Sequence, residues 1–230
     1  YSVDVGAGDD KVYLTKVASS INGNTGTDEA IVRAFDGFVD VYIDLQFSTY
    51  FVPSQLTAQD GMELSLQSFE KVTVEGNVAA TILGTSAADT LTGDSGADVI
   101  TGRGGADTLT GGSRSDTFVF ASGDTGITEA TADTITDFST GTDKIDVDAP
   151  GTYVEADGTG TDDLAAFITA ANNSLTTASD DIYAQYNFTG GGNTLVVIDE
   201  NASGTVNAGD TLIILTGLST AGGLDASDFI

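Results

Sequence analysis

The chain has 230 residues and a formal net charge of −28, because 35 Asp and Glu stand against 7 Lys and Arg. A surface this acidic repels phosphate backbones and anionic lipid heads, so nucleic acid and acidic membranes are not expected as partners. The sequence has no Cys and no His, which excludes disulfides, thiolate sites and the most common metal ligand and general base. No run reaches about 18 apolar residues, and we expect no membrane insertion.

The excess of acid has two interpretations. One is acidic solubilisation or disorder, and the other is that bound cations offset the charge. The second is favoured, because 40% of the residues are apolar and many follow strand-like patterns. The opening YSVDVGAGDD has no charged-then-apolar leader and reads as the interior of a longer protein.

The first predicted element, over residues 5–31, is a degenerate pair of coils. VGAGDDKVY (residues 5–13) and GNTGTDEAI (23–31) each place glycines before an aspartate and a small or apolar residue two positions later. The aspartates are Asp10 and Asp28, and Ser19 and Ile21 hold the matching positions between them. We expect a degenerate roll with one bound cation; two unrelated glycine turns are the alternative. The runs VDVYIDLQF, MELSLQSF and EKVTVEGN then alternate apolar and polar residues, as half-buried strands do.

Four consecutive nonapeptides begin at residue 84: GTSAADTLT, GDSGADVIT, GRGGADTLT and GGSRSDTFV. Position one holds Gly84, Gly93, Gly102 and Gly111; position six holds Asp89, Asp98, Asp107 and Asp116; position eight holds Leu91, Ile100, Leu109 and Phe118. Agreement at three positions in four units indicates an internal repeat. The apolar residue between flanking residues forms a short strand whose middle side chain points inward, and the glycines reverse the chain.

Two nonapeptides make one coil with two strands and two turns, so like aspartates return to the same edge after 18 residues. Asp89 and Asp107 share one edge, and Asp98 and Asp116 share the other. Stacking places carboxylates about 4.8 Å apart, which is repulsive without a counter-ion. Ca²⁺ accepts six to eight oxygens in flexible geometry, whereas Mg²⁺ is stricter and zinc and copper lack nitrogen and sulfur ligands here.

These nonapeptides resemble the RTX (repeats-in-toxin) family, whose parallel β-roll binds calcium between turns. The resemblance implies a mainly all-β fold, a β-roll or β-solenoid, with a β-rich C-terminal region that includes one short helix. It also implies that the aspartates named above and the turn glycines surround several calcium ions; these glycines are Gly84, Gly93, Gly96, Gly102, Gly105 and Gly111. Ala87 and Arg114 stand where the family pattern has Gly or Asn, so the first and last nonapeptides are the weaker expected binders, and the Asp98–Asp116 site the weakest.

The segment DTITDFSTGTDKIDV (133–147) resembles the closing segment of RTX rolls. Asp133, Asp137 and Asp143 supply either further calcium ligands or hydrogen-bonded turns. A helix is predicted over LAAFITAANNSL, with an N-cap at Thr161 or Asp162 and an apolar stripe that covers the roll or a sheet. The final LDASDFI resembles the end of substrates of type I secretion, an uncleaved export signal.

Between the predicted strands TLVVI and TLIIL lies the twelve-residue loop DENASGTVNAGD. It matches the spacing of an EF-hand-like calcium loop, with Gly204 at the bend and an Asp in place of the usual Glu at position 12. The expected ligands are Asp199, Asn201, Ser203, Thr205 through its carbonyl, Asn207 and Asp210. A hairpin with a polar loop and no ion is the alternative.

We therefore expect three regions: a degenerate roll over 1–82, the nonapeptide roll over 83–120, and a capping and secretion-signal region over 121–230. The favoured function is a calcium-dependent structural part of a type I-secreted bacterial S-layer protein, which folds outside the cell. The alternatives are the secretion and folding module of an extracellular metalloprotease or lipase, or part of an adhesin. With no G-x-S-x-G elbow and no Cys or His nucleophile or base, we expect no enzyme activity. Expected partners are calcium, other copies of the chain, the secretion machinery and, through another region, cell-surface glycan.

Overall fold

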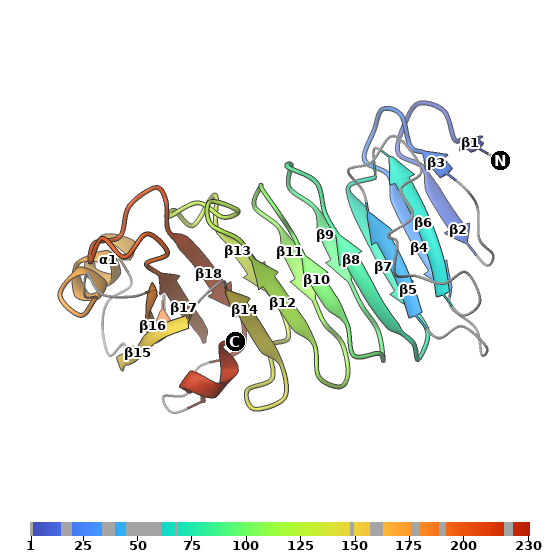
Figure 1. Cartoon of the computed structure of the whole chain (residues 1–230). Helices are drawn as coiled ribbons and strands as arrows, with labels where there is room; N and C mark the ends of the chain where they lie inside the picture. The colour runs from blue at the N-terminus through green and yellow to red at the C-terminus, as the bar shows by residue number, and fades with distance from the viewer. Residues whose placement is uncertain are drawn as a thin grey trace.

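The fold is described here from a computed structural model. It covers residues 2–14, 20–33, 40–44, 61–67, 69–147, 150–156, 163–175, 180–188, 192–218 and 223–230. The chain winds into an elongated roll of two β-sheets, with its N-terminal coils at one end and the only helix longer than one turn among these residues at the other (Figure 1). The prediction of a mainly β fold built as a parallel roll is confirmed.

One sheet has eight strands in the order β1-β3-β6-β5-β8-β10-β12-β14, and each neighbouring pair is parallel. Its strands are β1 (Ser2–Asp4), β3 (Ser20–Asn22), β5 (Asp40–Asp44), β6 (Gly61–Gln67), β8 (Ala79–Leu83), β10 (Val99–Thr101), β12 (Thr117–Phe120) and β14 (Lys144–Val147). The runs predicted as strands before the repeats thus form β5 and β6 here and β7 in the second sheet.

The other sheet has ten strands in the order β15-β16-β17-β18-β13-β11-β9-β7-β4-β2. Its strands are β2 (Lys11–Leu14), β4 (Glu29–Arg33), β7 (Lys71–Glu75), β9 (Thr90–Thr92), β11 (Thr108–Thr110), β13 (Asp133–Ile135), β15 (Pro150–Ala156), β16 (Asp180–Phe188), β17 (Asn193–Ile198) and β18 (Thr211–Leu215). The pairing is parallel from β2 to β18 and antiparallel in the hairpin steps β16–β17 and β17–β18.

The strands of the nonapeptides stack with a period of 18 residues, as the sequence predicts. Val99 pairs with Thr81 on one side and with Thr117 on the other. Each position-eight side chain is fully buried: Leu91, Ile100, Leu109 and Phe118. These residues belong to one apolar cluster that draws on both sheets. Burying each large apolar side chain contributes about 1.5–3 kcal/mol, so the short strands are held by the core between the sheets.

Outside the four nonapeptides the coil length varies. The offset between stacked residues grows to 42 between β4 and β7, to 26 between β11 and β13, and to 27 between β12 and β14. Between β4 and β7 the chain contributes two strands, β5 and β6, to the eight-stranded sheet, whereas the longer offsets after β11 and β12 come from residues that lie between strands. The roll therefore continues on both sides of residues 83–120.

The C-terminal region closes the roll. Helix α1 (Leu164–Asn172) places Phe167 and Ala171 against Tyr183 and Phe188 of β16. Its N-cap is Asp163, whose carboxylate accepts the Ala165 N–H at 3.0 Å. The predicted caps, Thr161 and Asp162, lie outside the described residues; Asp163 takes the role because its side chain reaches the orphan N–H two residues on.

The last residues dock on the eight-stranded sheet. The short 3₁₀ helix η1 (Ala226–Asp228) is followed by Phe229, which forms a β-bridge with Ile145 and is buried. Ile230 exchanges backbone hydrogen bonds of 3.0 Å with Ile145 and Val147. The LDASDFI segment thus pairs with the edge of β14 that no other strand of the eight-stranded sheet occupies.

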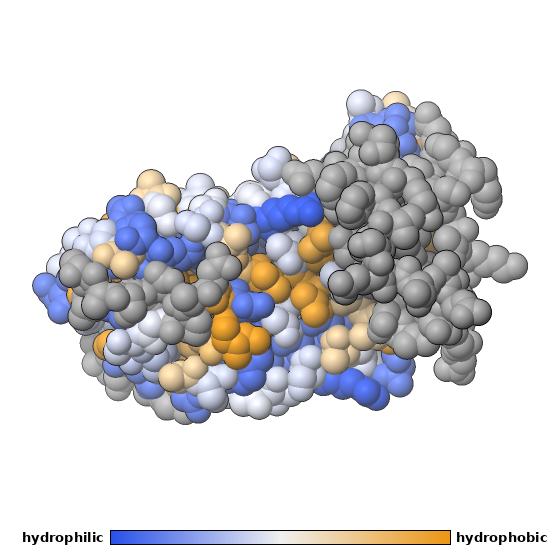
Figure 2. All heavy atoms as spheres, viewed as in Figure 1, coloured by the Kyte–Doolittle hydropathy of each residue, from blue (hydrophilic) through white to orange (hydrophobic). Residues whose placement is uncertain are grey.

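No helix in the described part of the chain has the length and apolarity that a membrane span needs. On the face seen in Figure 2, the described surface is mostly hydrophilic or neutral, with apolar residues gathered near the middle of the roll.

Candidate metal centre

Acidic residues stand directly before the strands of both sheets, at the turns of the roll. We call the row at the start of β2, β4, β7, β9, β11 and β13 the first edge. It consists of Asp10, Asp28, Glu70, Asp89 and Asp107, which directly precede their strands, and Asp133, the first residue of β13. The second edge is the row before β10, β12 and β14; it consists of Asp98, Asp116 and Asp143. Asp89 and Asp107 therefore lie on one edge and Asp98 and Asp116 on the other, in agreement with the predicted period.

Along each edge, one carboxylate oxygen is fixed by the coil before it. The Oδ1 of Asp107 accepts the backbone N–H of Asp89 at 2.8 Å, and the Oδ1 of Asp133 accepts that of Asp107 at 2.8 Å. On the second edge, the Oδ1 of Asp116 accepts the Asp98 N–H at 2.8 Å. Each aspartate is thereby held at a set depth between two stacked turns.

The second oxygen of several of these carboxylates has no partner. The Oδ1 of Asp89 and the Oδ2 of Asp107, Asp116 and Asp133 are buried and receive no hydrogen bond. The side chains themselves are at most 3% exposed. Because a buried, unpartnered carboxylate oxygen is costly, these positions call for either a proton or a cation.

The electrostatics of the edges agree with this. Burial raises the pKa of Asp116 to about 6, of Asp107 to about 7 and of Asp133 to about 8, and neighbouring carboxylates add to each shift. Burial also raises the pKa of Asp89, Asp98 and Asp143. Without a counter-charge, these stacked carboxyl groups therefore lose their protons only at a higher pH than free aspartate does.

The position-one glycines form cradles beside these oxygens. A Cβ on Gly102 would overlap the Oδ2 of Asp107, and a Cβ on Gly111 would overlap the Oδ2 of Asp116. At Gly93 the carbonyl oxygen of Gly111 comes equally close. Gly84, Gly96 and Gly105 likewise leave no room for a side chain against the neighbouring turn. Carboxylate and carbonyl oxygens therefore converge on spaces that only glycine leaves open.

This donor set fits a hard divalent cation. All the groups are oxygens, several carry unneutralised charge, and calcium tolerates the irregular geometry of carboxylates mixed with turn carbonyls. Within the described ranges, no group of three or more acidic side chains is arranged to hold one metal ion. Each site in the roll would consequently rest on one or two carboxylates completed by main-chain carbonyls.

The three acids after the repeats divide between the two predicted alternatives. Asp137 accepts the N–H groups of Gly111 and Gly112 at 3.0 and 2.8 Å. Asp143 accepts the N–H groups of Asp116 and Ser139 at 3.0 and 2.8 Å. In Asp137 and Asp143, therefore, both carboxylate oxygens accept backbone N–H groups. In Asp133, one carboxylate oxygen has no hydrogen-bond partner.

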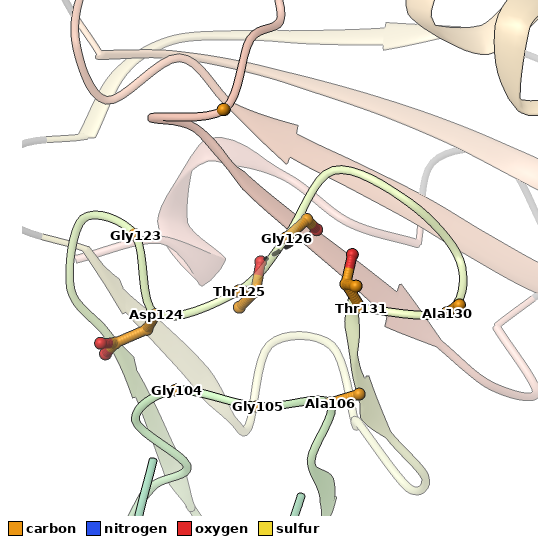
Figure 3. Close-up of a pocket in the computed structure, with 10 residues that line it drawn as sticks. Gly104, Gly105, Ala106, Gly123, Asp124, Thr125, Gly126, Ala130 and Thr131 are labelled. Carbon is orange, nitrogen blue, oxygen red and sulfur yellow. Dashed lines mark hydrogen bonds between the residues drawn. The ribbon is translucent and has the colours of Figure 1, made fainter. Parts of the chain in front are cut away.

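Between β12 and β13, the loop of residues 121–132 replaces the short turn of a nonapeptide. It stands over residues 104–106 and leaves an open pocket of about 460 Å³ (Figure 3). Asp124 lines this pocket, and its charge adds to the effect of burial on the pKa of Asp107 and Asp133. The insertion thus brings one more acid to the first edge.

The N-terminal coils repeat the same construction outside the four nonapeptides. The Oδ1 of Asp28 accepts the Asp10 N–H at 2.8 Å, and the Oδ2 atoms of both residues are buried without a partner. The Asp28 N–H in turn donates to Glu70 at 2.8 Å. Glu70 was not predicted as a site residue, although an acid at the first position of the predicted strand EKVTVEGN was a usable signal. Ser19 lies outside the described residues, and Ile21 is buried as its position implies.

The β17–β18 loop brings its six predicted ligands together. Asp199 accepts the N–H groups of Ser203 and Gly204, at 3.0 and 2.6 Å, and Asp210 accepts the Asn201 side-chain amide at 2.6 Å. The Asn207 amide donates to the Ser203 hydroxyl and to the Thr205 carbonyl. Burial and the charge of Asp199 raise the pKa of Asp210 to about 6. The six side chains and carbonyls of the loop thus lie close together and are held by hydrogen bonds to one another, in which the oxygens accept from amide and N–H groups of the same loop.

The two arginines of the repeats lie in different surroundings. Arg114 is exposed and has a positive φ of 88°. Arg103 is half-buried, and its guanidinium donates to the carbonyl oxygen of Gly84 at 2.7 Å. The sequence analysis singled out Arg114 and overlooked Arg103, the arginine that contacts a stacked turn.

Comparison with known families agrees with this geometry. Residues 83–118 match the family described as RTX calcium-binding nonapeptide repeat, in four copies. A comparison with curated proteins finds no match to the chain. Repeats of this family are structural calcium-binding elements and are typical of proteins exported by type I secretion. Residues 83–118 are thus a block of RTX calcium-binding repeats within a longer parallel β-roll, which supports an RTX protein.

Proposed function

We propose that this chain is a structural module of a secreted bacterial cell-surface protein, and that its roll folds when it binds calcium outside the cell. The observation that supports this most is the row of buried carboxylate oxygens without partners at Asp107, Asp116 and Asp133. A fold that buries such charges at neutral pH is favourable only with a counter-charge in place.

The proposed ligands in the roll are the acids and cradle glycines already described. They are Asp10, Asp28, Asp89, Asp98, Asp107, Asp116 and Asp133 with Gly84, Gly93, Gly96, Gly102, Gly105 and Gly111. A second kind of site is the β17–β18 loop, where Asp199, Asn201, Ser203, Thr205, Asn207 and Asp210 would turn oxygens to one ion. Calcium supplies positive charge to these oxygens; the residues themselves set its position through the hydrogen bonds of their other atoms.

Folding and binding are coupled in this proposal. A chain with a net charge of −28 and 29 glycines loses much conformational freedom and gains much self-repulsion on folding. At the low calcium level of a cytosol these costs keep the repeats open, in a form that can be exported. Extracellular calcium sites typically bind at about 10⁻⁴–10⁻³ M, a concentration reached outside the cell, so folding follows export.

Circular dichroism of the whole chain in calcium and in EGTA tests this coupling. We expect β structure in calcium and its loss in EGTA, with recovery when calcium is restored. Magnesium at the same concentration is the control, because its stricter octahedral geometry suits these irregular donor sets poorly. An identical spectrum in calcium and EGTA would reject calcium-coupled folding.

We further propose that the parent protein assembles into an S-layer lattice. A sequence rich in glycine and threonine, without Cys or His, suits a repetitive scaffold. The alternatives are a folding module of an extracellular enzyme and part of an adhesin. Electron microscopy separates them: calcium-dependent sheets support the lattice, whereas a zinc-protease motif in the same gene product would favour the enzyme module.

A further inference from the structure

The second position of each nonapeptide differs between the two edges of the roll. It holds Thr85, Asp94, Arg103 and Gly112. The third nonapeptide stacks on the first at the first edge, since Gly104 and Gly105 lie against Ser86 and Ala87. The fourth stacks on the second at the second edge, since Gly112 lies against the Asp94 carbonyl. Arg103 and Gly112 therefore occupy equivalent places in two stacked turns.

At the first edge, Arg103 reaches back across the stack. Its Nη1 atom donates to the carbonyl oxygen of Gly84 at 2.7 Å in a partly buried contact. The same glycine lies beside the Oδ2 of Asp89 and the carbonyl of Gly102, which would both overlap a Cβ at Gly84. The positive charge also acts on the Asp89 carboxyl, where it lowers a pKa that burial raises. A cation is thus already present among the oxygens of this turn pair.

At the second edge, no arginine takes that place. Gly93 lies beside the Oδ2 of Asp98 and the carbonyl of Gly111, the same arrangement as at Gly84, and the residue matching Arg103 is Gly112. The nearby Arg114 is exposed. The charges that raise the pKa of Asp116, after burial, come from the carboxylates Asp98, Asp143 and Asp137. This turn pair keeps its oxygens and its negative charge without an internal cation.

We propose that the guanidinium of Arg103 takes the place of one calcium ion between the first and third nonapeptides. A guanidinium has five N–H donors and a permanent positive charge, and it is less strongly hydrated than an ammonium group. It can therefore donate hydrogen bonds to carbonyl and carboxylate oxygens in a partly buried site. It also repels a divalent ion placed among the same oxygens. The Gly84 carbonyl is consequently satisfied by the chain itself. The Asp98–Asp116 site takes calcium through the Oδ2 of Asp116, because both oxygens of Asp98 already accept backbone N–H groups.

This assignment reverses the order of the two sites expected from the sequence. Arg114, which replaces a turn glycine, was expected to weaken the Asp98–Asp116 pair. Its side chain is exposed, whereas Arg103, for which no role was predicted from the sequence, donates to a stacked turn. The proposal rests on the calcium-binding function proposed above and refines it, since it removes Gly84 and Asp89 from the proposed calcium ligands and lowers the number of ions by one.

The test counts calcium ions per chain by native mass spectrometry, with isothermal titration calorimetry as an independent count. Arg103→Gly removes the guanidinium, and Arg114→Gly is the matched control, because both arginines have positive φ values, 66° and 88°, which glycine adopts freely. We expect Arg103→Gly to bind one ion more than the wild-type chain and Arg114→Gly to bind the wild-type number.

Arg103→Met, which keeps the length of the side chain without its charge, covers the case in which the glycine variant fails to fold. We expect it to gain one ion too. An unchanged count in a variant that shows the wild-type β spectrum in calcium would overturn the proposal. If the wild-type chain and Arg114→Gly bind no calcium at all, the proposed function fails instead, so the two failures are distinguishable.

Discussion

Replacing Asp116 with Asn separates the structural role of this residue from its charge. The Oδ1 of Asp116 accepts the Asp98 N–H at 2.8 Å, and an asparagine keeps that acceptor. Its Oδ2 is buried without a partner, and an amide nitrogen there cannot bind a cation. The variant therefore keeps the hydrogen bond that positions the turn and loses the oxygen proposed to face calcium.

The size of the effect follows from linkage. A site with a dissociation constant of about 10⁻⁴ M, at about 10 mM calcium, stabilises the folded state by about 2.7 kcal/mol. For a chain of this length, that corresponds to a melting temperature about 5–10 °C lower in the variant when calcium is present. The assay is thermal unfolding followed by circular dichroism at fixed calcium, on Asp116→Asn and the wild-type chain.

Asp225→Asn is the matched control for this experiment. Asp225 is exposed and caps the short helix η1 through the Ser227 N–H, away from the rows of unpartnered oxygens. We expect this variant to respond to calcium as the wild-type chain does. The reasoning is refuted if Asp116→Asn melts at the wild-type temperature in calcium, or if the two variants lose the same amount.

Three further outcomes follow from the structure. Gly111→Ala places a Cβ over the Oδ2 of Asp116 and should abolish part of the calcium stabilisation, whereas Gly104→Ala, with no atom nearer than 3.6 Å, should not; equal calcium titrations of the two variants would contradict this. Ile100→Ala empties a fully buried core position and should cost about 2–5 kcal/mol in urea unfolding with calcium; a loss below 1 kcal/mol would contradict the core assignment. In EGTA, the folded fraction measured by circular dichroism should rise as the pH falls from about 8 to about 6. Burial raises the pKa of Asp133 to about 8, Asp107 to about 7 and Asp116 to about 6, so the folded state binds protons more tightly than the unfolded state in this range. A folded fraction that falls over the same range would contradict the assigned pKa directions.

The regular part of the roll could be predicted because one short pattern carries three constraints. Glycine marks the turn, the aspartate precedes the strand, and the buried residue two positions later fixes the register. Those constraints gave the 18-residue stacking of Asp98 on Asp116, which the backbone pairing of Val99 with Thr117 bears out. The EF-hand-like spacing of residues 199–210 likewise predicted which polar side chains lie together in the β17–β18 loop.

The irregular part could not be predicted from spacing. Glu70 and Asp133 extend the first edge, but strands β5 and β6 in one case and the loop of residues 121–132 in the other place them 42 and 26 residues from their stacked partners, so no fixed period finds them. Loop length costs little free energy as long as the strands stay in the sheet, which leaves the insertions free to vary. Asp133 was predicted only through the resemblance of residues 133–147 to the closing segment of RTX rolls, and Glu70 was not predicted.

The roles of the two arginines also depend on three-dimensional contacts. Both interrupt glycine-rich turns and both stand where the repeat pattern has glycine, so the pattern does not show which of the two side chains contacts the stack. Which side chain turns toward the stack depends on the backbone of the neighbouring coil. Arg103 reaches the Gly84 carbonyl across 19 residues, a contact that no local pattern encodes.

The most direct test of calcium-coupled folding is a crystal structure of the chain grown with calcium, with the ions located by anomalous scattering. We expect ions about 2.3–2.6 Å from the Oδ2 atoms of Asp107, Asp116 and Asp133, with turn carbonyls as the other ligands. Beside the Gly84 carbonyl we expect the Arg103 guanidinium and no ion. A folded roll with no ion near any of these carboxylate oxygens at millimolar calcium would contradict the central claim.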